Sequence, residues 1–194
     1  MDQMYPLPAA RWASGNIPDN VTVGLNTLIT GPKAFQRFRG TRQPALVIGQ
    51  HCTLDGVSLA INPQGFVQIG DYCAFYGSII LCELEVRIGQ GVVMGWNTVI
   101  SDSDFHPTEP AERLADAIAC SMLAAGRPRR AYPSRPVVIG DDVYVGHAAT
   151  ILKGVTVGAG AIIEPGAMVT RDVPAGMRVM GNPAQLIGPA EEEP

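Results

Sequence analysis

Hydrophobic residues recur at every sixth position along the last third of the chain. From Ile139 to Val169 each sixth residue is Ile or Val, and the residue four places later is small or β-branched. Six residues suffice for one short strand and one corner, so three such units would close a triangular coil with its apolar residues inside. One coil cannot bury its own apolar face, so the period predicts a stack of coils. The inward series is Ile139, Val145, Ile151, Val157, Ile163 and Val169.

The same period can be followed towards the N-terminus, with a one-residue slip after Leu81. The pattern predicts an all-β fold, a parallel β-helix whose coils stack at about 4.8 Å. We expect residues 1–47 to lead into the first coils, 48–188 to form the β-helix domain and 189–194 to form a mobile tail. The earlier inward series is Ile69, Phe75 and Leu81, then Ile88, Met94 and Ile100, with weaker traces at Val23, Ile29, Ile48 and Leu54.

The period stops once, between Ile100 and Ile139. We expect residues 101–138 to form an extruded loop, because long insertions in compact domains are usually functional or disordered. Within it, residues 113–125 favour a short helix that Gly126 can end, and residues 127–136 form a stiff basic connector with four arginines. The arginines of that connector are Arg127, Arg129, Arg130 and Arg135. They either form a solvent-exposed face or attract an anionic acceptor.

Composition and charge exclude several other classes. The 194 residues include 22 Gly and 16 Pro, too many for a helical bundle, and 46% are hydrophobic, too many for a disordered chain. The net charge of −4 gives no basic field for nucleic acid, and no apolar run reaches the ~18 residues of a membrane span. The N-terminal residues lack a signal-peptide pattern, and the four cysteines show no zinc-ribbon spacing. These features favour a cytoplasmic protein with reduced thiols, of which Cys52 and Cys73 fall at small inward positions.

The ordered motifs resemble those of the hexapeptide-repeat acyltransferases. These motifs are the repeats, a His-Pro loop at 102–107 followed by Thr-Glu-Pro-Ala-Glu-Arg, the segment 139–146, and Gly-Asn-Pro-Ala at 181–184. The similarity covers about residues 69–187 and is strongest to maltose- and galactoside-type sugar O-acetyltransferases and their polysaccharide-modifying relatives. It implies a left-handed parallel β-helix, a homotrimer and acetyl-CoA as acyl donor, held in a groove between neighbouring prisms.

The resemblance assigns His106 as the catalytic base. An imidazole can take the proton of an acceptor hydroxyl as it attacks the thioester and then return that proton to the departing thiolate. Asp102 or Asp104 could orient the ring, although a capping or turn role is at least as plausible for either carboxylate. His51 and His147 lie far from His106 in the sequence, so the three histidines do not suggest a zinc site, and no metal is expected.

The resemblance also implies the residues that contact the coenzyme and the acceptor. Gln185 and Gly188 stand where the sugar enzymes have Arg, which weakens the phosphate end of the site unless Lys153 or Arg178 compensates. Glu83 and Tyr132 match acceptor-binding positions, but Phe75 replaces an Asn of the sugar enzymes. The coenzyme positions are Tyr144, His147, Pro165, Thr170, Arg171 and Gln185.

Two other functions compete with a sugar O-acetyltransferase. One is a xenobiotic, antibiotic or amino-sugar N-acyltransferase of the same fold, whose relatives also lack the Arg of the tail. The other is a non-catalytic scaffold prism, because a fold alone does not specify a reaction. The loop from Asp102 to Arg113 favours the sugar enzymes, and the presence of His106 in it argues against the scaffold.

Overall fold

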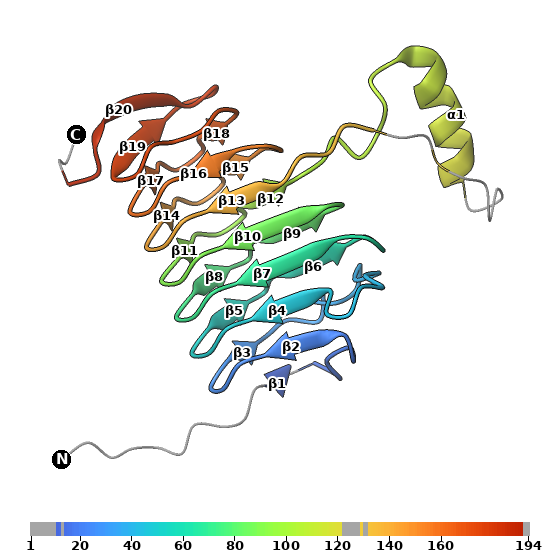
Figure 1. The fold of residues 1–194 in the computed structure, drawn as a ribbon, viewed down its shortest axis with the longest axis horizontal. Coiled ribbons are helices and arrows are strands. Elements are labelled where there is room, and N and C mark those ends of the chain that lie inside the picture. The colour runs from blue at the N-terminus through green and yellow to red at the C-terminus, as the bar shows by residue number, and fades with distance from the viewer. Residues whose placement is uncertain (1–10, 13, 122–128, 130–131, 192–194) are drawn as a thin grey trace.

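The computed structural model describes residues 11–12, 14–121, 129 and 132–191. Short strands wind around three sheets, and all strand pairs are parallel except the last. Figure 1 shows the coils stacked from the N-terminal end to the C-terminal end, with the helix α1 (Pro110–Cys120) held away from the stack. The all-β class, the parallel β-helix and the extruded loop with a short helix are thus confirmed.

The first sheet has nine strands and contains the first and the last strand of the described chain. Its last pair, β19 and β20, is antiparallel and lies at the C-terminal end of the stack. In sheet order its strands are β1 (Arg11–Trp12), β3 (Leu28–Ile29), β5 (Thr53–Asp55), β8 (Ala74–Tyr76), β11 (Val93–Met94), β14 (Tyr144–Val145), β17 (Ile162–Ile163), β19 (Met177–Met180) and β20 (Gln185–Pro189).

The other two sheets complete the prism. The second sheet consists of β16 (Thr156–Val157), β13 (Val137–Ile139), β10 (Glu85–Ile88), β7 (Phe66–Ile69), β4 (Leu46–Ile48) and β2 (Val21–Val23). The third sheet consists of β18 (Met168–Val169), β15 (Thr150–Ile151), β12 (Val99–Ser101), β9 (Ile79–Cys82) and β6 (Ser58–Ile61). The stacking therefore reaches back into residues 1–47, and at the other end residues 192–194 of the expected tail lie outside the described chain.

The six-residue period places the core. Every member of the series from Ile139 to Val169 is at most 1% exposed, and its small partners such as Ala149 and Ala161 are buried as well. The backbones of successive coils approach so closely that a Cβ on Gly49 would lie 2.6 Å from the carbonyl carbon of Gly70. The interior of the C-terminal coils is consequently filled by Ile, Val and Ala, and Cys52 and Cys73 are buried in earlier coils, as expected.

Two details of the expected pattern are wrong. Leu81 does not point inward, because β9 begins only three residues after β8 ends and buries Ile80 and Cys82 instead. The helix begins at Pro110 and not at Arg113, since Pro is suited to the first helical turn, where its missing N–H costs nothing. It ends at Cys120, and the extended backbone of Ser121 follows. Residues 122–126, where we expected the helix to end, lie outside the described chain.

Candidate active site

The extruded loop leaves the prism after β12 and returns at β13. At its base Asp104 N–H donates to the carbonyl oxygen of Pro133 at 3.1 Å, and Arg135 N–H donates to that of Asp102 at 2.8 Å. Ser103 and Ser134 form an antiparallel bridge between the two arms of the loop. The loop therefore begins as a paired, two-stranded stem whose geometry is set by the prism.

Asp102 lies where this stem leaves the prism and has a structural role there. Its side chain is fully buried and accepts hydrogen bonds from the backbone N–H groups of Glu83, Leu84 and Glu85 at 2.7–2.8 Å. Burial raises the pKa of its carboxyl group, against the opposing effect of these three donors. Asp102 thus caps the turn after β9 and does not orient His106.

Asp116 is the carboxylate that orients the catalytic candidate. Its side chain is 1% exposed, and one of its oxygens lies 2.7 Å from Nδ1 of His106. A carboxylate can only accept, so Nδ1 must donate, and in the neutral ring Nε2 is left as an acceptor. The imidazole itself is 65% exposed. Neither carboxylate suggested by the sequence has this role, because Asp104 pairs with Lys153.

Arg129 holds the same carboxylate from its other side. Its Nε and Nη2 donate to the two oxygens of Asp116 at 2.9 and 3.0 Å, and Nη2 also donates to the carbonyl oxygen of Phe105 at 2.6 Å. The hydrogen bonds from Arg129, and then from His106, lower the pKa of the Asp116 carboxyl to about 2. The carboxylate therefore remains ionised across the range in which an enzyme would work.

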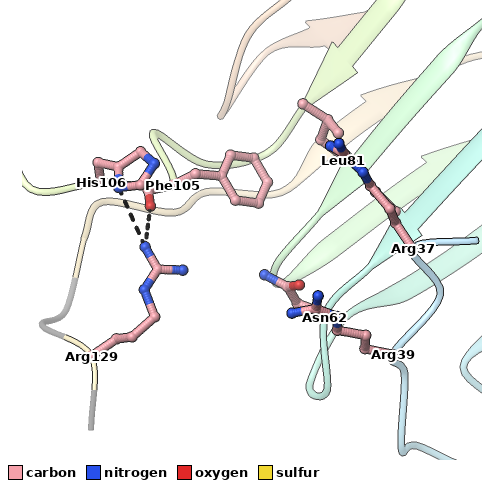
Figure 2. Close-up of a pocket in the computed structure, with 8 residues that line it drawn as sticks. Arg37, Arg39, Asn62, Leu81, Phe105, His106 and Arg129 are labelled. Carbon is pink, nitrogen blue, oxygen red and sulfur yellow. Dashed lines mark hydrogen bonds between the residues drawn. The ribbon is translucent and has the colours of Figure 1, made fainter. Parts of the chain in front are cut away.

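His106 lines a pocket of about 470 Å³ that lies between the loop and the prism. Figure 2 shows His106, Phe105 and Arg129 on the loop side, facing residues from the prism side. The prism side is contributed by the strands β6 and β9 and by the segment before β4. Its lining residues are Arg37, Arg39, Ala60, Asn62 and Leu81.

The two expected acceptor residues meet beside this pocket. Glu83 follows β9 and binds both the side-chain amide of Asn62 and the phenol of Tyr132. Burial and the hydrogen bond to Glu83 raise the pKa of Tyr132 to about 12, so the phenol stays protonated. Phe75, which replaces the Asn of the sugar enzymes, is fully buried in the prism core, as its place in the inward series predicts, and offers no contact to an acceptor.

The expected coenzyme residues divide between two corners of the prism. Tyr144, His147 and Pro165 are exposed where the nine-stranded sheet turns into the five-stranded one, and Gly166 N–H donates to the carbonyl oxygen of His147 at 2.9 Å. Thr170 and Arg171 follow β18 at the other edge of that sheet. One chain therefore does not bring all of them together.

Arg171 and Gln185 do share a smaller pocket, of about 190 Å³. The two basic residues that could have replaced the missing Arg contacts are both engaged elsewhere. Arg178 pairs with Glu164 at 2.5 Å, and Lys153 pairs with Asp104. Among the described residues, Arg171 is thus the basic side chain in this second pocket.

One group of side chains has metal-binding chemistry. Ligand atoms of His106, Asp116 and Cys120 lie within 4.8 Å of one another. Both oxygens of Asp116 already accept from Arg129 and His106, so the positive guanidinium group occupies the place where a cation would bind. The arrangement favours a hydrogen-bonded catalytic pair over a metal centre.

Four residues of the site, Asp116, Arg37, Arg39 and Asn62, were not predicted from the sequence. Asp116 offered one signal, since it stands alone among Ala and Ile in the middle of the helix, where Asp is a poor helix former. Arg37 and Arg39 lie in the segment without a clear period, and nothing in their spacing links them to His106.

The comparisons with known proteins agree with the fold and its repeats. Residues 136–171 match the family described as "Bacterial transferase hexapeptide (six repeats)". A hexapeptide-repeat acetyltransferase from Vibrio cholerae, solved with acetyl-CoA, is 26% identical, with 65% of this chain and 61% of that chain covered and a TM-score of 0.54. A galactoside acetyltransferase solved with coenzyme A is also 26% identical, with 70% and 60% covered and a TM-score of 0.56.

A curated relative matches over a shorter stretch. The 2,3,4,5-tetrahydropyridine-2,6-dicarboxylate N-acetyltransferase of Staphylococcus aureus is 58% identical over 57 residues, which are 29% of this chain and 24% of that protein. The chain therefore spans about a quarter of the curated relatives it matches. The fold and the repeats of residues 136–171 are thus similar to those of the hexapeptide-repeat transferases. The resemblance of the chain to the hexapeptide-repeat acetyltransferases is confirmed. Within the described residues, no helix is long and apolar enough to cross a membrane.

Proposed function

We propose that this protein is an acetyl-CoA-dependent O-acetyltransferase that acts on a sugar or another small hydroxylated acceptor. The observation that carries the proposal is the pair of His106 and buried Asp116 at the mouth of a pocket. Asp116 fixes the ring so that Nε2 is the free acceptor. A base held in this way suits deprotonation of a hydroxyl group that lies in the pocket.

The reaction is a direct transfer. Nε2 of His106 takes the hydroxyl proton while the acceptor oxygen attacks the thioester carbonyl, and the C–S bond then breaks as the imidazolium returns the proton to the coenzyme A thiolate. Asp116 stabilises the imidazolium between these steps, because it remains ionised. Cys120 lies near this pair, and a covalent acyl-cysteine route is the alternative that the test must separate.

Acetyl-CoA would lie against Tyr144, His147, Pro165, Thr170, Arg171 and Gln185. Since these residues occupy two corners of one prism, we propose a homotrimer in which each coenzyme groove is completed by a neighbouring chain. Arg171 is suited to a coenzyme phosphate because a guanidinium group can donate two parallel hydrogen bonds to it. The trimer and the cytoplasmic location stay predictions, and a monomer mass in light scattering would contradict the first.

The test follows the release of free coenzyme A from acetyl-CoA with a panel of sugars and amino sugars. We expect His106→Ala to lower kcat by about 10²- to 10⁴-fold, the contribution of a general base, with an unchanged melting temperature. Cys120→Ala is the matched control, and direct transfer requires that it keep near-normal turnover.

Other outcomes identify the competing functions. Transfer to amines alone would make the protein an N-acyltransferase, for which the match to an N-acetyltransferase is the supporting observation. Saturating acetyl-CoA should raise the melting temperature, because a ligand that binds only the folded state stabilises it. No shift and no turnover with any acceptor would instead identify a scaffold prism.

A further inference from the structure

Positive charge is concentrated at the pocket that His106 faces. Three arginines line it, and no carboxylate is among its lining residues in the described part of the chain. This is notable in a protein whose net charge is −4. Asp116, which does not line the pocket, forms an ion pair with Arg129. The positive charge that remains uncompensated in the pocket therefore belongs to Arg37 and Arg39.

Arg37 and Arg39 differ from the paired arginines of the described chain. Arg87 pairs with Glu85, and Arg178 pairs with Glu164. No described residue accepts a hydrogen bond from the guanidinium group of Arg37 or Arg39. A guanidinium group without a protein partner in a pocket retains all five donors for a ligand.

The prism holds the backbone of these two residues in place. Arg39 N–H donates to the carbonyl oxygen of Ile61 at 2.8 Å, and Leu59 N–H donates to that of Ala34 at 2.9 Å. Ala34 and Phe35 are buried in the core just before Arg37. The segment is therefore fixed along β6 while its arginines remain exposed at the pocket.

The two guanidinium groups and the base lie on opposite sides of the pocket. In Figure 2 Arg37 extends from the prism side beside Leu81, Arg39 lies beside Asn62, and His106 projects from the loop. Glu83 is the nearby carboxylate, but it is held by Asn62 and Tyr132 and does not line the pocket. A ligand in the pocket would consequently meet positive charge at one end and the base at the other.

We infer that the pocket takes an acceptor with an oxyanion, a carboxylate or phosphate group, held by Arg37 and Arg39. Forked guanidinium donors match the paired oxygens of such groups, and a volume of about 470 Å³ suits a ligand of monosaccharide-phosphate size. The group anchors the far end of the acceptor and directs its nucleophile at His106. The inference rests on the proposed function for the reaction, but the binding of the anion can be tested without it.

The test measures dissociation constants by calorimetry for three probes of similar size: glucose 6-phosphate, glucuronate and glucose. We expect at least one anionic probe to bind about tenfold or more tightly than glucose, since hydrogen bonds to charged groups are the stronger ones. The phosphate and carboxylate probes show which oxyanion is preferred. The double variant Arg37→Gln/Arg39→Gln should weaken the anionic probe by at least about tenfold and leave glucose unchanged.

Arg42→Gln is the matched control. Arg42 comes from the same segment, but its guanidinium group lies over the Phe66 ring at 5.1 Å and does not line the pocket. The Arg42→Gln variant should bind the probes as the unaltered protein does. Thermal unfolding checks that all variants have the same melting temperature. Equal binding of anionic and neutral probes, no binding of either anion, or no effect of the double variant would overturn the inference.

Failure of the inference can be told apart from failure of the proposed function. Turnover of neutral acceptors without any dependence on Arg37 and Arg39 would retain the enzyme and remove the anion site. Arginine-dependent binding of the anionic probe to a protein that never consumes acetyl-CoA would retain the anion site and remove the acetyltransferase.

Discussion

The prism and the extruded loop of this protein are stabilised in different ways. In the prism, each coil repeats the contacts of its neighbours, and every inward residue from Ile139 to Val169 is a buried Ile or Val. In the loop, a single buried carboxylate, Asp116, connects Arg129 and His106, and no second copy of that arrangement exists among the described residues. The prism can therefore absorb many substitutions as long as its period is kept, whereas the proposed chemistry depends on a few contacts.

The largest effect expected from this difference is on stability, from Ile151→Ala. Ile151 is fully buried, and such truncations cost about 2–5 kcal/mol of the free energy of unfolding, because transfer energy is lost and a cavity remains. Thermal or denaturant unfolding followed by circular dichroism measures it. Ile118→Ala is the matched control, because Ile118 lies in α1 and is 47% exposed. A similar loss of stability in both variants would remove the distinction between prism and loop.

What could be predicted from the sequence follows the same division. The period located the inward residues from Ile139 to Val169, because each of them repeats the environment of the one before. It failed at Leu81, where a shortened turn after β8 shifts the inward positions to Ile80 and Cys82. A period carries information only while successive coils have the same length.

The candidate site was predicted less completely. His106 was found through the family motif of the loop, and Glu83 and Tyr132 were found as a pair that the structure brings into contact. Asp116 lies ten residues from His106 and reaches it only because the loop folds back on its helix. Arg37 is separated from His106 by the strands from β4 to β12. Contacts of this kind depend on tertiary folding and leave no local pattern.

An intermediate effect is expected from Asp116→Asn, this time on catalysis. The amide preserves shape but removes the charge that fixes the tautomer and stabilises the imidazolium, so kcat should fall by at least about tenfold, yet by less than the loss of His106 itself. The melting temperature of the prism should change little. Coenzyme A release and thermal unfolding measure the two quantities.

Asp104→Asn provides the control for that variant. Asp104 lies in the same loop and pairs with Lys153, away from the imidazole. Unaltered kcat in Asp116→Asn, or an equal fall in both variants, would show that the carboxylate serves the loop in general and not the base.

The smallest effect expected is a selective loosening of the loop in acid. The bonds to Arg129 and His106 lower the pKa of Asp116 from 3.8 to about 2, so the stability they provide is complete above about pH 4 and is lost as the pH falls towards 2. At Asp102, burial raises the pKa, so protonation there relieves a buried charge as the pH falls. Acidification therefore acts in opposite directions on the two carboxylates.

Hydrogen exchange between pH 4 and pH 2, corrected for the intrinsic exchange rate, can detect this difference. Amides of α1 should lose protection relative to those of β12, because only the loop depends on the ionised Asp116. In Arg129→Gln the largest cause of the lowered pKa is gone, so α1 should already be less protected at pH 5 and should lose less on acidification. Parallel loss in α1 and β12 would mean that the loop and the prism open as one unit. The loop and the prism would then differ in sequence pattern but not in stability.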